Sequence, residues 1–277
     1  MAAGQPSGTQ AQPDMLRWFD AGVNLFSSQF DADRPQLVLQ AQQAGVCGQL
    51  LISSDLAETA LNADFASNWP GLYCTAGVHP HQAAAVNPDW LQQLQQLLNQ
   101  PGMVAIGECG LDFDRMFSPK PQQIAVFSAQ LTLARQLHKA VYLHERAAFE
   151  TQLQLLQDHQ ISRGIAHCFT GNRQQMQQYL DAGLYIGITG WLCDERRGSE
   201  LQDALRYLPL DRLILETDAP YLLPRTLTIK PKPRRNAPAF LPAIASAVAA
   251  IGGYSLADIS WHSRQNCQLL FGLESLC

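Results

Sequence analysis

Eight short apolar segments recur along the chain, and stretches with helical periodicity separate them. The apolar segments span residues 19–25, 47–53, 72–79, 104–111, 140–145, 164–170, 184–190 and 213–220. Near-continuous apolar runs of this length are typical of strands buried on both faces of a parallel sheet. Helical stretches lie between them, among others at 35–45, 89–100, 122–139 and 148–160. This alternation predicts parallel βαβ units.

Eight such units in 277 residues favour a closed (β/α)8 barrel, or TIM barrel, over an open doubly wound sheet. No G-x-G-x-x-G follows the first strand, which also argues against a dinucleotide-binding sheet. Two more helical segments, 238–251 and 255–271, follow the last strand, and we expect the first to pack as an extra or final barrel helix. Because no linker divides the chain, we predict one domain over residues 16–277 after a disordered tail at 1–15.

The composition excludes several classes of protein. The chain is 47% hydrophobic and 16% charged, and it contains neither a signal-peptide pattern nor an uninterrupted apolar run of about 18 residues. Seven scattered cysteines without a C-x-x-C pair argue against a disulfide framework or a structural zinc site. We therefore expect a cytoplasmic, monomeric protein with no membrane segment.

Polar side chains interrupt four of the predicted strands near their ends. These residues are Glu108, His144, His167 and Asp218. Each alone fits a hydrogen-bonded core residue or a helix cap, but four intrusions into four strands would need four separate structural reasons. At the carboxyl-terminal mouth of a barrel they would form an active site. Two imidazoles and two carboxylates suit a divalent cation used in hydrolysis, with Mg²⁺ preferred and Mn²⁺ as the alternative.

Strand alternation orients the neighbours of these residues. Glu216 and Asp218 should share one face, so that Glu216 lies one layer deeper in the barrel. By the same alternation, Cys109 and Cys168 should point outward and serve as packing residues. After the eighth strand, residues 225–235 carry five basic groups and no acid in a chain of net charge −5. This segment could bind a phosphate backbone or be a solvated charge run.

Five motifs at these positions resemble the TatD family of metal-dependent nucleases. They are G-V-H-P-H (77–81), G-E-C-G-L-D (107–112), H-x-R-x-A (144–148), H-C-F-T-G (167–171) and E-T-D-A-P-Y-L (216–222). The resemblance runs from about residue 18 to 273. It implies a TIM barrel of the metal-dependent hydrolase type, a bound divalent metal and hydrolysis of DNA. It also implies 3′-to-5′ exonuclease activity on single-stranded DNA and on RNA.

The resemblance assigns roles to individual residues. Glu108, His144, His167 and Asp218 match the metal-site positions, and Asp218 and Glu108 are the expected catalytic residues. Residues expected to contact substrate are His79, Arg146, Arg234 and Arg235. His81 is expected to be structural, although both histidines could instead only fix their loop. Arg146 could alternatively brace Glu108 and Asp218.

The chain departs from the family pattern at two places. Many members begin D-x-H-x-H, whereas Gly22 and Asn24 stand at the two histidine positions, which puts a second metal in doubt. The R-N-E-P motif reads R-N-A-P, with Ala237 in place of the glutamate. Two other functions remain open: a small-molecule amidohydrolase, and a nucleic-acid-binding barrel without turnover. Amidohydrolase barrels often carry a carbamylated lysine on the fourth strand, where this chain has Glu108.

Overall fold

The computed structural model of the protein describes residues 16–274. The predicted tail at 1–15 and the last three residues of the predicted domain lie outside this range. Eight parallel strands pair in sequence order. They are β1 (Trp18–Val23), β2 (Val46–Leu51), β3 (Leu72–Ala76), β4 (Met103–Asp112), β5 (Ala140–Arg146), β6 (Gly164–Ala166), β7 (Tyr185–Ile188) and β8 (Leu213–Leu215). The prediction of a (β/α)8 barrel is confirmed.

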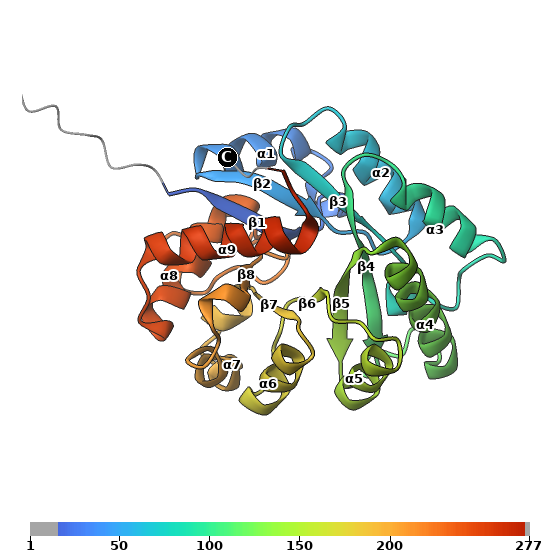
Figure 1. Ribbon diagram of the computed structural model, residues 1–277. Coiled ribbons are helices and arrows are strands. Elements are labelled where there is room, and N and C mark those ends of the chain that lie inside the picture. Colours follow the sequence, from blue (N-terminus) through green and yellow to red (C-terminus); the bar gives the residue numbers. More distant parts are fainter. Residues whose placement is uncertain (1–15, 275–277) are drawn as a thin grey trace, which may run out of the picture.

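Helices surround the strands on the outside (Figure 1). They are α1 (Arg34–Gln43), α2 (Leu56–Ala66), α3 (Trp90–Leu98), α4 (Lys120–Leu137), α5 (Phe149–Asp158), α6 (Arg173–Asp181), α7 (Ser199–Leu205), α8 (Leu241–Gly252) and α9 (Leu256–Phe271). Strands β6 and β8 are shorter than the apolar runs that predicted them. The residues that follow them, 167–170 and 216–220, are therefore outside regular strand geometry, although they keep their place at the mouth.

The barrel closes between β8 and β1 at the carboxyl ends of the strands. Val23 forms an isolated parallel bridge with Ala219. The Asp218 N–H donates to the Gly22 carbonyl at 2.9 Å, and the Asn24 N–H donates to the Ala219 carbonyl at 2.9 Å. The seam of the barrel therefore runs beside Asp218, one of the four predicted metal-site residues.

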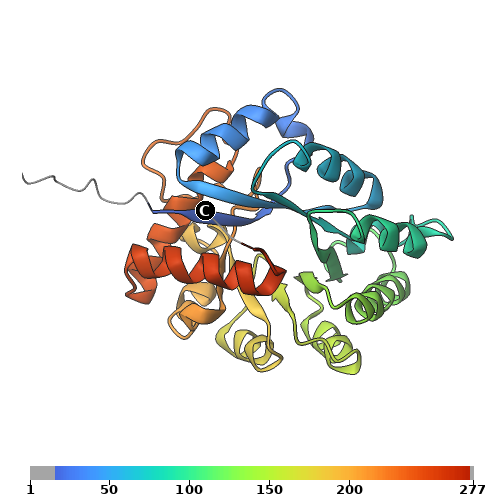
Figure 2. The same cartoon turned by 45° about the horizontal axis from the view of Figure 1, so that its top comes forward.

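Helix α9 closes the opposite end of the barrel (Figure 2). Its Cys267, Leu270 and Phe271 belong to the same buried cluster as Phe19 and Ile214, which lie on the strands. No single described helix is long and apolar enough to cross a membrane. Helices α8, with the turn before it, and α9 pass that test only as a pair, and the pair is bent by 113°.

The cysteines of the described range are mostly unpaired. Cys74, Cys109, Cys168, Cys193 and Cys267 are free thiols, and Cys47 is disulfide-bonded. The argument from sequence against a disulfide framework therefore holds at those five positions and fails at Cys47. The cytoplasmic location stays a prediction.

Asp20 of β1 strengthens the seam from within the barrel wall. Its side chain is fully buried. Its Oδ1 accepts the Thr217 N–H at 2.8 Å, and its Oδ2 accepts the Thr217 hydroxyl at 2.5 Å. Burial, only partly offset by these bonds, raises the pKa of Asp20 from 3.8 to about 8. The folded protein consequently holds a proton here that the unfolded chain releases.

Stability should therefore fall as pH rises between about 4 and 8, because the folded state binds the extra proton over that window. Asp20→Asn cannot ionise and should remove this component. We expect the unfolding free energy of the wild type, measured with urea in EDTA at pH 5, 6.5 and 8, to decline relative to that of Asp20→Asn. Asp181→Asn, on the exposed face of α6, is the control and should follow the wild type. Parallel profiles for the wild type and Asp20→Asn would contradict the prediction.

Candidate metal-dependent active site

Three of the four predicted metal-site residues meet around one carboxylate oxygen. Glu108 lies on β4, His144 on β5, and His167 directly after β6. The Oε1 atom of Glu108 is 2.8 Å from His144 Nδ1 and 3.9 Å from His167 Nε2. Glu108 and His167 are buried, and His144 is half-buried. The strand ends thus bring together three side chains that are far apart in the sequence.

Asp218 completes the group from the seam. Its Oδ1 is 3.8 Å from His167 Nε2 and accepts the amide of Asn24 at 2.8 Å. On the inner side of the same imidazole, His167 Nδ1 is 2.5 Å from Oε2 of the fully buried Glu216. Glu216 and Asp218 therefore contact opposite nitrogens of His167, so both point inward as predicted. Strand alternation is not the reason, because β8 ends at Leu215 and Asp218 has a φ of +53°.

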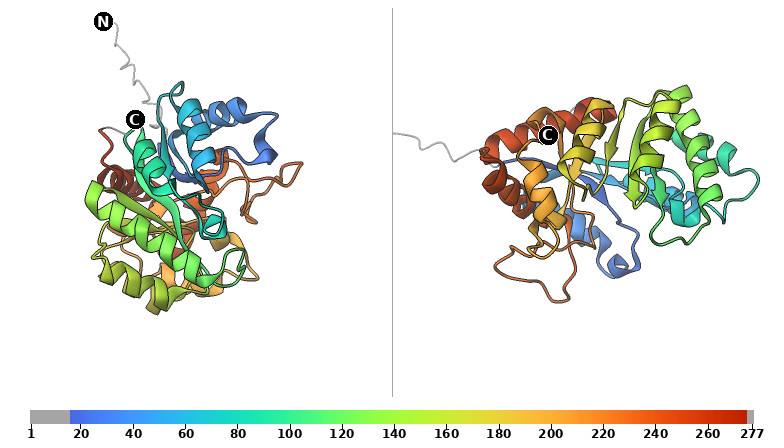
Figure 3. Two further views of the ribbon diagram at one scale, coloured as in Figure 1. Left: turned by 90° about the vertical axis from the view of Figure 1, so that its right-hand side faces the viewer. Right: turned by 90° about the horizontal axis from the view of Figure 1, so that it is seen from below.

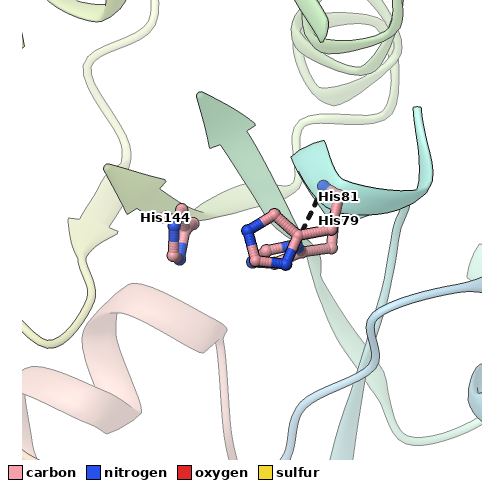
Figure 4. A group of neighbouring side chains, drawn as sticks. All are labelled: His79, His81 and His144. Carbon is pink, nitrogen blue, oxygen red and sulfur yellow. Dashed lines mark hydrogen bonds between the residues drawn. The ribbon is translucent and has the colours of Figure 1, made fainter. Parts of the chain in front are cut away.

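His79 and His81 face the site from the turn after β3. The rings of His79, His81 and His144 lie next to one another, with ring centroids of His79 4.2 Å from His81 and 4.4 Å from His144 (Figure 4). His79 Nδ1 accepts the His81 N–H at 3.1 Å, and its Nε2 is 3.5 Å from Glu108 Oε1. His81 Nε2 is 2.7 Å from Asp112 Oδ2. His79 is thus directed at the predicted metal site, whereas His81 is bound to a carboxylate at its rim.

The potential ligand atoms of the site form two groups. His79, His81 and His144 make one, and His167, Cys168 and Asp218 make the other, with the atoms of each group lying within 4.8 Å of one another. Glu108 lies between the two groups through its contacts with His79, His144 and His167. Imidazole and carboxylate donors at these separations are a suitable set for a divalent cation.

The charges of the site reinforce one another. Burial opposes ionisation of Glu108, but the surrounding histidines outweigh it and hold the pKa of Glu108 well below its usual range. Burial likewise opposes protonation of His167, yet Glu216, Glu108 and Asp218 raise its pKa to about 10. Burial raises the pKa of Asp218 to about 6, with the His167 charge acting against that rise. The raised pKa of His167 keeps a positive charge inside the site, whereas burial lowers the pKa of His79.

Cys168 does not point outward, so the prediction for this residue is wrong. Its Sγ lies within the group that contains ligand atoms of His167 and Asp218, and it is 3.4 Å from the Thr189 hydroxyl. Strand β6 ends at Ala166 and Cys168 has a φ of +44°, so the alternation of a strand does not apply to it. Burial raises the pKa of its thiol, which disfavours a thiolate nucleophile. Cys109 is fully buried in the core, as predicted.

Arg146 ends β5 at the mouth. It lines a cavity of about 460 Å³ together with Phe113, Glu145, Thr170 and Gln175. Within the described residues, no hydrogen bond or ion pair joins its guanidinium to Glu108 or Asp218. The bracing role considered for Arg146 therefore has no support, and phosphate contact remains its predicted role.

The basic segment 225–235 projects from the barrel between β8 and α8 (Figure 3). Arg235 does not face open solvent: it forms a two-pronged ion pair with Asp33, at 2.5 and 3.0 Å, and lies over the Phe30 ring. Arg225 is similarly paired with Glu195. Lys230, Lys232 and Arg234 are exposed, and no described residue forms an ion pair with them. The two arginines predicted to bind substrate thus differ, since Arg235 anchors the segment and Arg234 is free.

Sequence reasoning missed the contacts that three polar residues make in the site. Asp112 closes the GECGLD motif and accepts backbone N–H groups of Asp114 and Arg115 as well as His81. Its acidic side chain at the end of a strand was a usable signal. Tyr142 and Asn24 also contact the predicted ligands. In the sequence, Tyr142 looks like an ordinary strand residue. Its part in the site is evident only from its contacts with His167 and Glu216. Ala237, which replaces the family glutamate, is buried in the core.

Comparison with known proteins agrees with this geometry. Residues 19–272 match the family described as TatD related DNase. The chain is 48% identical over 258 residues to the "3'-5' ssDNA/RNA exonuclease TatD" of Klebsiella pneumoniae, covering 92% of this chain and 98% of that protein. It is 49% identical to the protein of the same name from a Rahnella species, covering 93% and 99%. The chain belongs to the TatD family.

Solved structures give the same assignment. A TatD homologue from Escherichia coli, YJJV, superposes with a TM-score of 0.85 at 27% identity, covering 94% of this chain and 99% of that one. A TatD family hydrolase from Entamoeba histolytica shares the fold with a TM-score of 0.82 at 24% identity, covering 92% and 98%.

Arg235 should hold the basic segment against the barrel. Removing its guanidinium in Arg235→Gln breaks the ion pair with Asp33 and the contact with Phe30, so the segment should open more often. We expect amide hydrogen exchange over residues 226–235 to accelerate by about tenfold, which corresponds to about 1.4 kcal/mol of lost local stability. Arg234→Gln, the neighbouring charge without a partner, is the control and should exchange as the wild type. Equal exchange in both variants would contradict the anchoring role.

Proposed function

We propose that this chain is a metal-dependent exonuclease that hydrolyses single-stranded DNA, and RNA as well, from the 3′ end. The observation that carries the proposal is the convergence of His144 and His167 within 4 Å of Glu108 Oε1, with Asp218 beside His167. The relatives at 48–49% identity are named for this activity, and they are covered almost completely.

The residues proposed to hold the metal are Glu108, His144, His167 and Asp218. All four are drawn from different strand ends, and their two carboxylates suit Mg²⁺, with Mn²⁺ as the alternative. Glu108 Oε1 lies 2.8 Å from His144 Nδ1 and 3.9 Å from His167 Nε2, so these side chains contact each other directly. A bound cation would take the place of these contacts. His79, whose Nε2 faces Glu108, is an additional donor at the same place.

The chain's own residues supply positioning and proton transfer. A bound metal would polarise a phosphate oxygen and lower the pKa of its water. Asp218 is proposed to complete the set of metal ligands or to act as the general base, because it lies at the mouth with its Oδ1 3.8 Å from His167 Nε2. The Asn24 amide fixes its orientation. Glu108 is the proposed catalytic carboxylate at the centre of the site, because three histidines surround it.

Substrate would reach this site from the mouth. His79 and Arg146 are proposed to contact the phosphate next to the cleaved bond, and Lys230, Lys232 and Arg234 to bind the strand further away. Tyr221 and Phe117 are half-exposed or more and could stack bases, whereas Phe169 is buried and packs in the core. We retain Arg235 as an indirect contributor, through the anchor it gives to the basic segment. A monomeric, cytoplasmic enzyme is also part of the proposal.

An amidohydrolase activity is less well supported. Solved structures titled amidohydrolases or deacetylases share the fold at 11–23% identity with TM-scores from 0.58 to 0.81, which is a likeness of fold alone. Glu108 occupies β4, where such enzymes often carry a modified lysine. A panel of amide substrates assayed beside oligonucleotides would separate the two activities.

The test of the proposal is digestion of oligonucleotides labelled at either end, single- or double-stranded, with Mg²⁺, Mn²⁺ or EDTA. We expect stepwise shortening of single strands from the 3′ end, which EDTA stops. His144→Ala and His167→Ala should each lower kcat/KM by more than about 100-fold. Loss of a residue that only supports a metal ligand typically costs about 10- to 100-fold in activity, and loss of the ligand itself should cost more. The circular dichroism of the two variants should match that of the wild type. A folded variant with near wild-type turnover at limiting metal would refute the assignment.

The exposed cations of the basic segment should contribute salt-dependent binding. Replacing Lys230, Lys232 and Arg234 with Gln should raise KM for a long oligonucleotide. It should also flatten the dependence of log affinity on log salt by about 2, since each phosphate contact on a single strand contributes about 0.7. A small chromogenic phosphodiester should be hydrolysed as before.

The matched control replaces three arginines away from the basic segment with Gln: Arg17, Arg135 and Arg206. It has the same net charge as the triple variant and should behave as the wild type. Equal effects of the two triple variants would show that only net charge matters. Equal losses on the long and the small substrate would show that the segment supports the metal site instead.

A further inference from the structure

Tyr142 reaches the predicted metal site from inside the barrel. Its side chain is fully buried on β5. Its hydroxyl lies 2.6 Å from His167 Nδ1 and donates a short hydrogen bond to Glu216 Oε2. A buried tyrosine hydroxyl requires a polar partner. Here both partners belong to the chain of contacts that leads to the proposed metal ligand His167.

Glu216 connects Tyr142 to His167. Its Oε1 accepts the Cys168 N–H at 3.0 Å, and its Oε2 contacts both His167 Nδ1 and the Tyr142 hydroxyl. A fully buried carboxylate needs such donors to remain in place. A proton on Nδ1, donated to Glu216, leaves the lone pair on Nε2. That atom faces Glu108 and Asp218 at 3.9 and 3.8 Å.

Two glycines create the space for this arrangement. A Cβ at Gly22 would collide with the Tyr142 hydroxyl and lie 2.7 Å from Glu216 Oε2. A Cβ at Gly187 would collide with Glu216 Oε1. Position 22 is also where the TatD pattern often has a histidine. In this chain the Tyr142 hydroxyl therefore occupies the space into which a side chain at position 22 would extend.

We propose that Tyr142 is a positioning residue that holds Glu216 against His167 Nδ1, so that His167 presents Nε2 to the metal. Gly22 is also required for this arrangement, because the absence of a side chain there leaves room for the Tyr142 hydroxyl. The inference rests on the proposed function, since it takes His167 as a metal ligand. Outer partners of a ligating histidine fix its tautomer and orientation, and their loss typically costs about 10- to 100-fold in metal affinity.

The experiment compares Tyr142→Phe with Tyr179→Phe. Tyr179 is the matched control: it is equally buried, and its hydroxyl contacts Gln152, away from the predicted metal ligands. Mn²⁺ affinity is measured by titration calorimetry, and the ¹H shift of the His167 Nδ1–H group by NMR of metal-free protein labelled with ¹⁵N at histidine. We expect Tyr142→Phe to weaken Mn²⁺ binding by about tenfold. It should also move the Nδ1–H resonance of His167, because this group faces Glu216 Oε2, which Tyr142 holds in place. Tyr179→Phe should change neither.

An unchanged Mn²⁺ affinity and an unchanged Nδ1–H resonance in Tyr142→Phe, or equal changes in Tyr179→Phe, would overturn the inference. Gly22→Ala gives a second measurement. Gly22→Ala should weaken Mn²⁺ binding strongly in the wild-type background and less in the Tyr142→Phe background. Equal effects in the two backgrounds would contradict the steric coupling between Gly22 and Tyr142. If His144→Ala and His167→Ala bind Mn²⁺ as the wild type does, the proposed metal site itself fails. If they lose Mn²⁺ and Tyr142→Phe does not, only the role of Tyr142 fails.

Discussion

The imidazole of His167 joins the interior of the barrel to its mouth. Its Nδ1 is bonded to the buried Glu216, and its Nε2 faces Glu108 and Asp218. Burying two carboxylates and an imidazole in an apolar barrel is costly unless each is paired. The site therefore depends on a continuous set of contacts, in which a change at one member leaves a buried neighbour without a partner.

The same region carries the closure of the barrel. Thr217 lies between Glu216 and Asp218, and Asp20 of β1 holds both its N–H and its hydroxyl. The backbone bonds between residues 22–24 and 218–219 complete the seam. Strand β8 itself has only three residues, so the side chain of Asp20 supplies part of the pairing that a longer strand would provide. The contacts that close the seam are therefore also the contacts that place Asp218.

The sequence was sufficient to predict the fold and the convergence of Glu108, His144, His167 and Asp218, because strand periodicity places strand ends at one face. It also predicted the inward direction of Glu216. It failed at Cys168, which follows the last residue of β6 and has a positive φ. Asp218 follows β8 in the same way, so its inward position could not be derived from alternation either. The sequence could not separate Arg234 from Arg235. The partner that distinguishes them, Asp33, is about 200 residues away and has no local signature.

The two departures from the family pattern, at position 22 on β1 and at position 24 just after it, each lie beside residues that contact a proposed ligand. Gly22 leaves space for the Tyr142 hydroxyl, while the Asn24 amide donates to Asp218. One position therefore supports His167 from within, and the other orients Asp218 from the seam. Neither residue is a histidine. A histidine at position 22 would collide with the Tyr142 hydroxyl, and one at position 24 would replace the amide that donates to Asp218. Positions 22 and 142 consequently constrain each other, whereas position 24 acts on Asp218 separately. A single reversion toward histidine at position 22 would remove the room for Tyr142 before it could add a ligand.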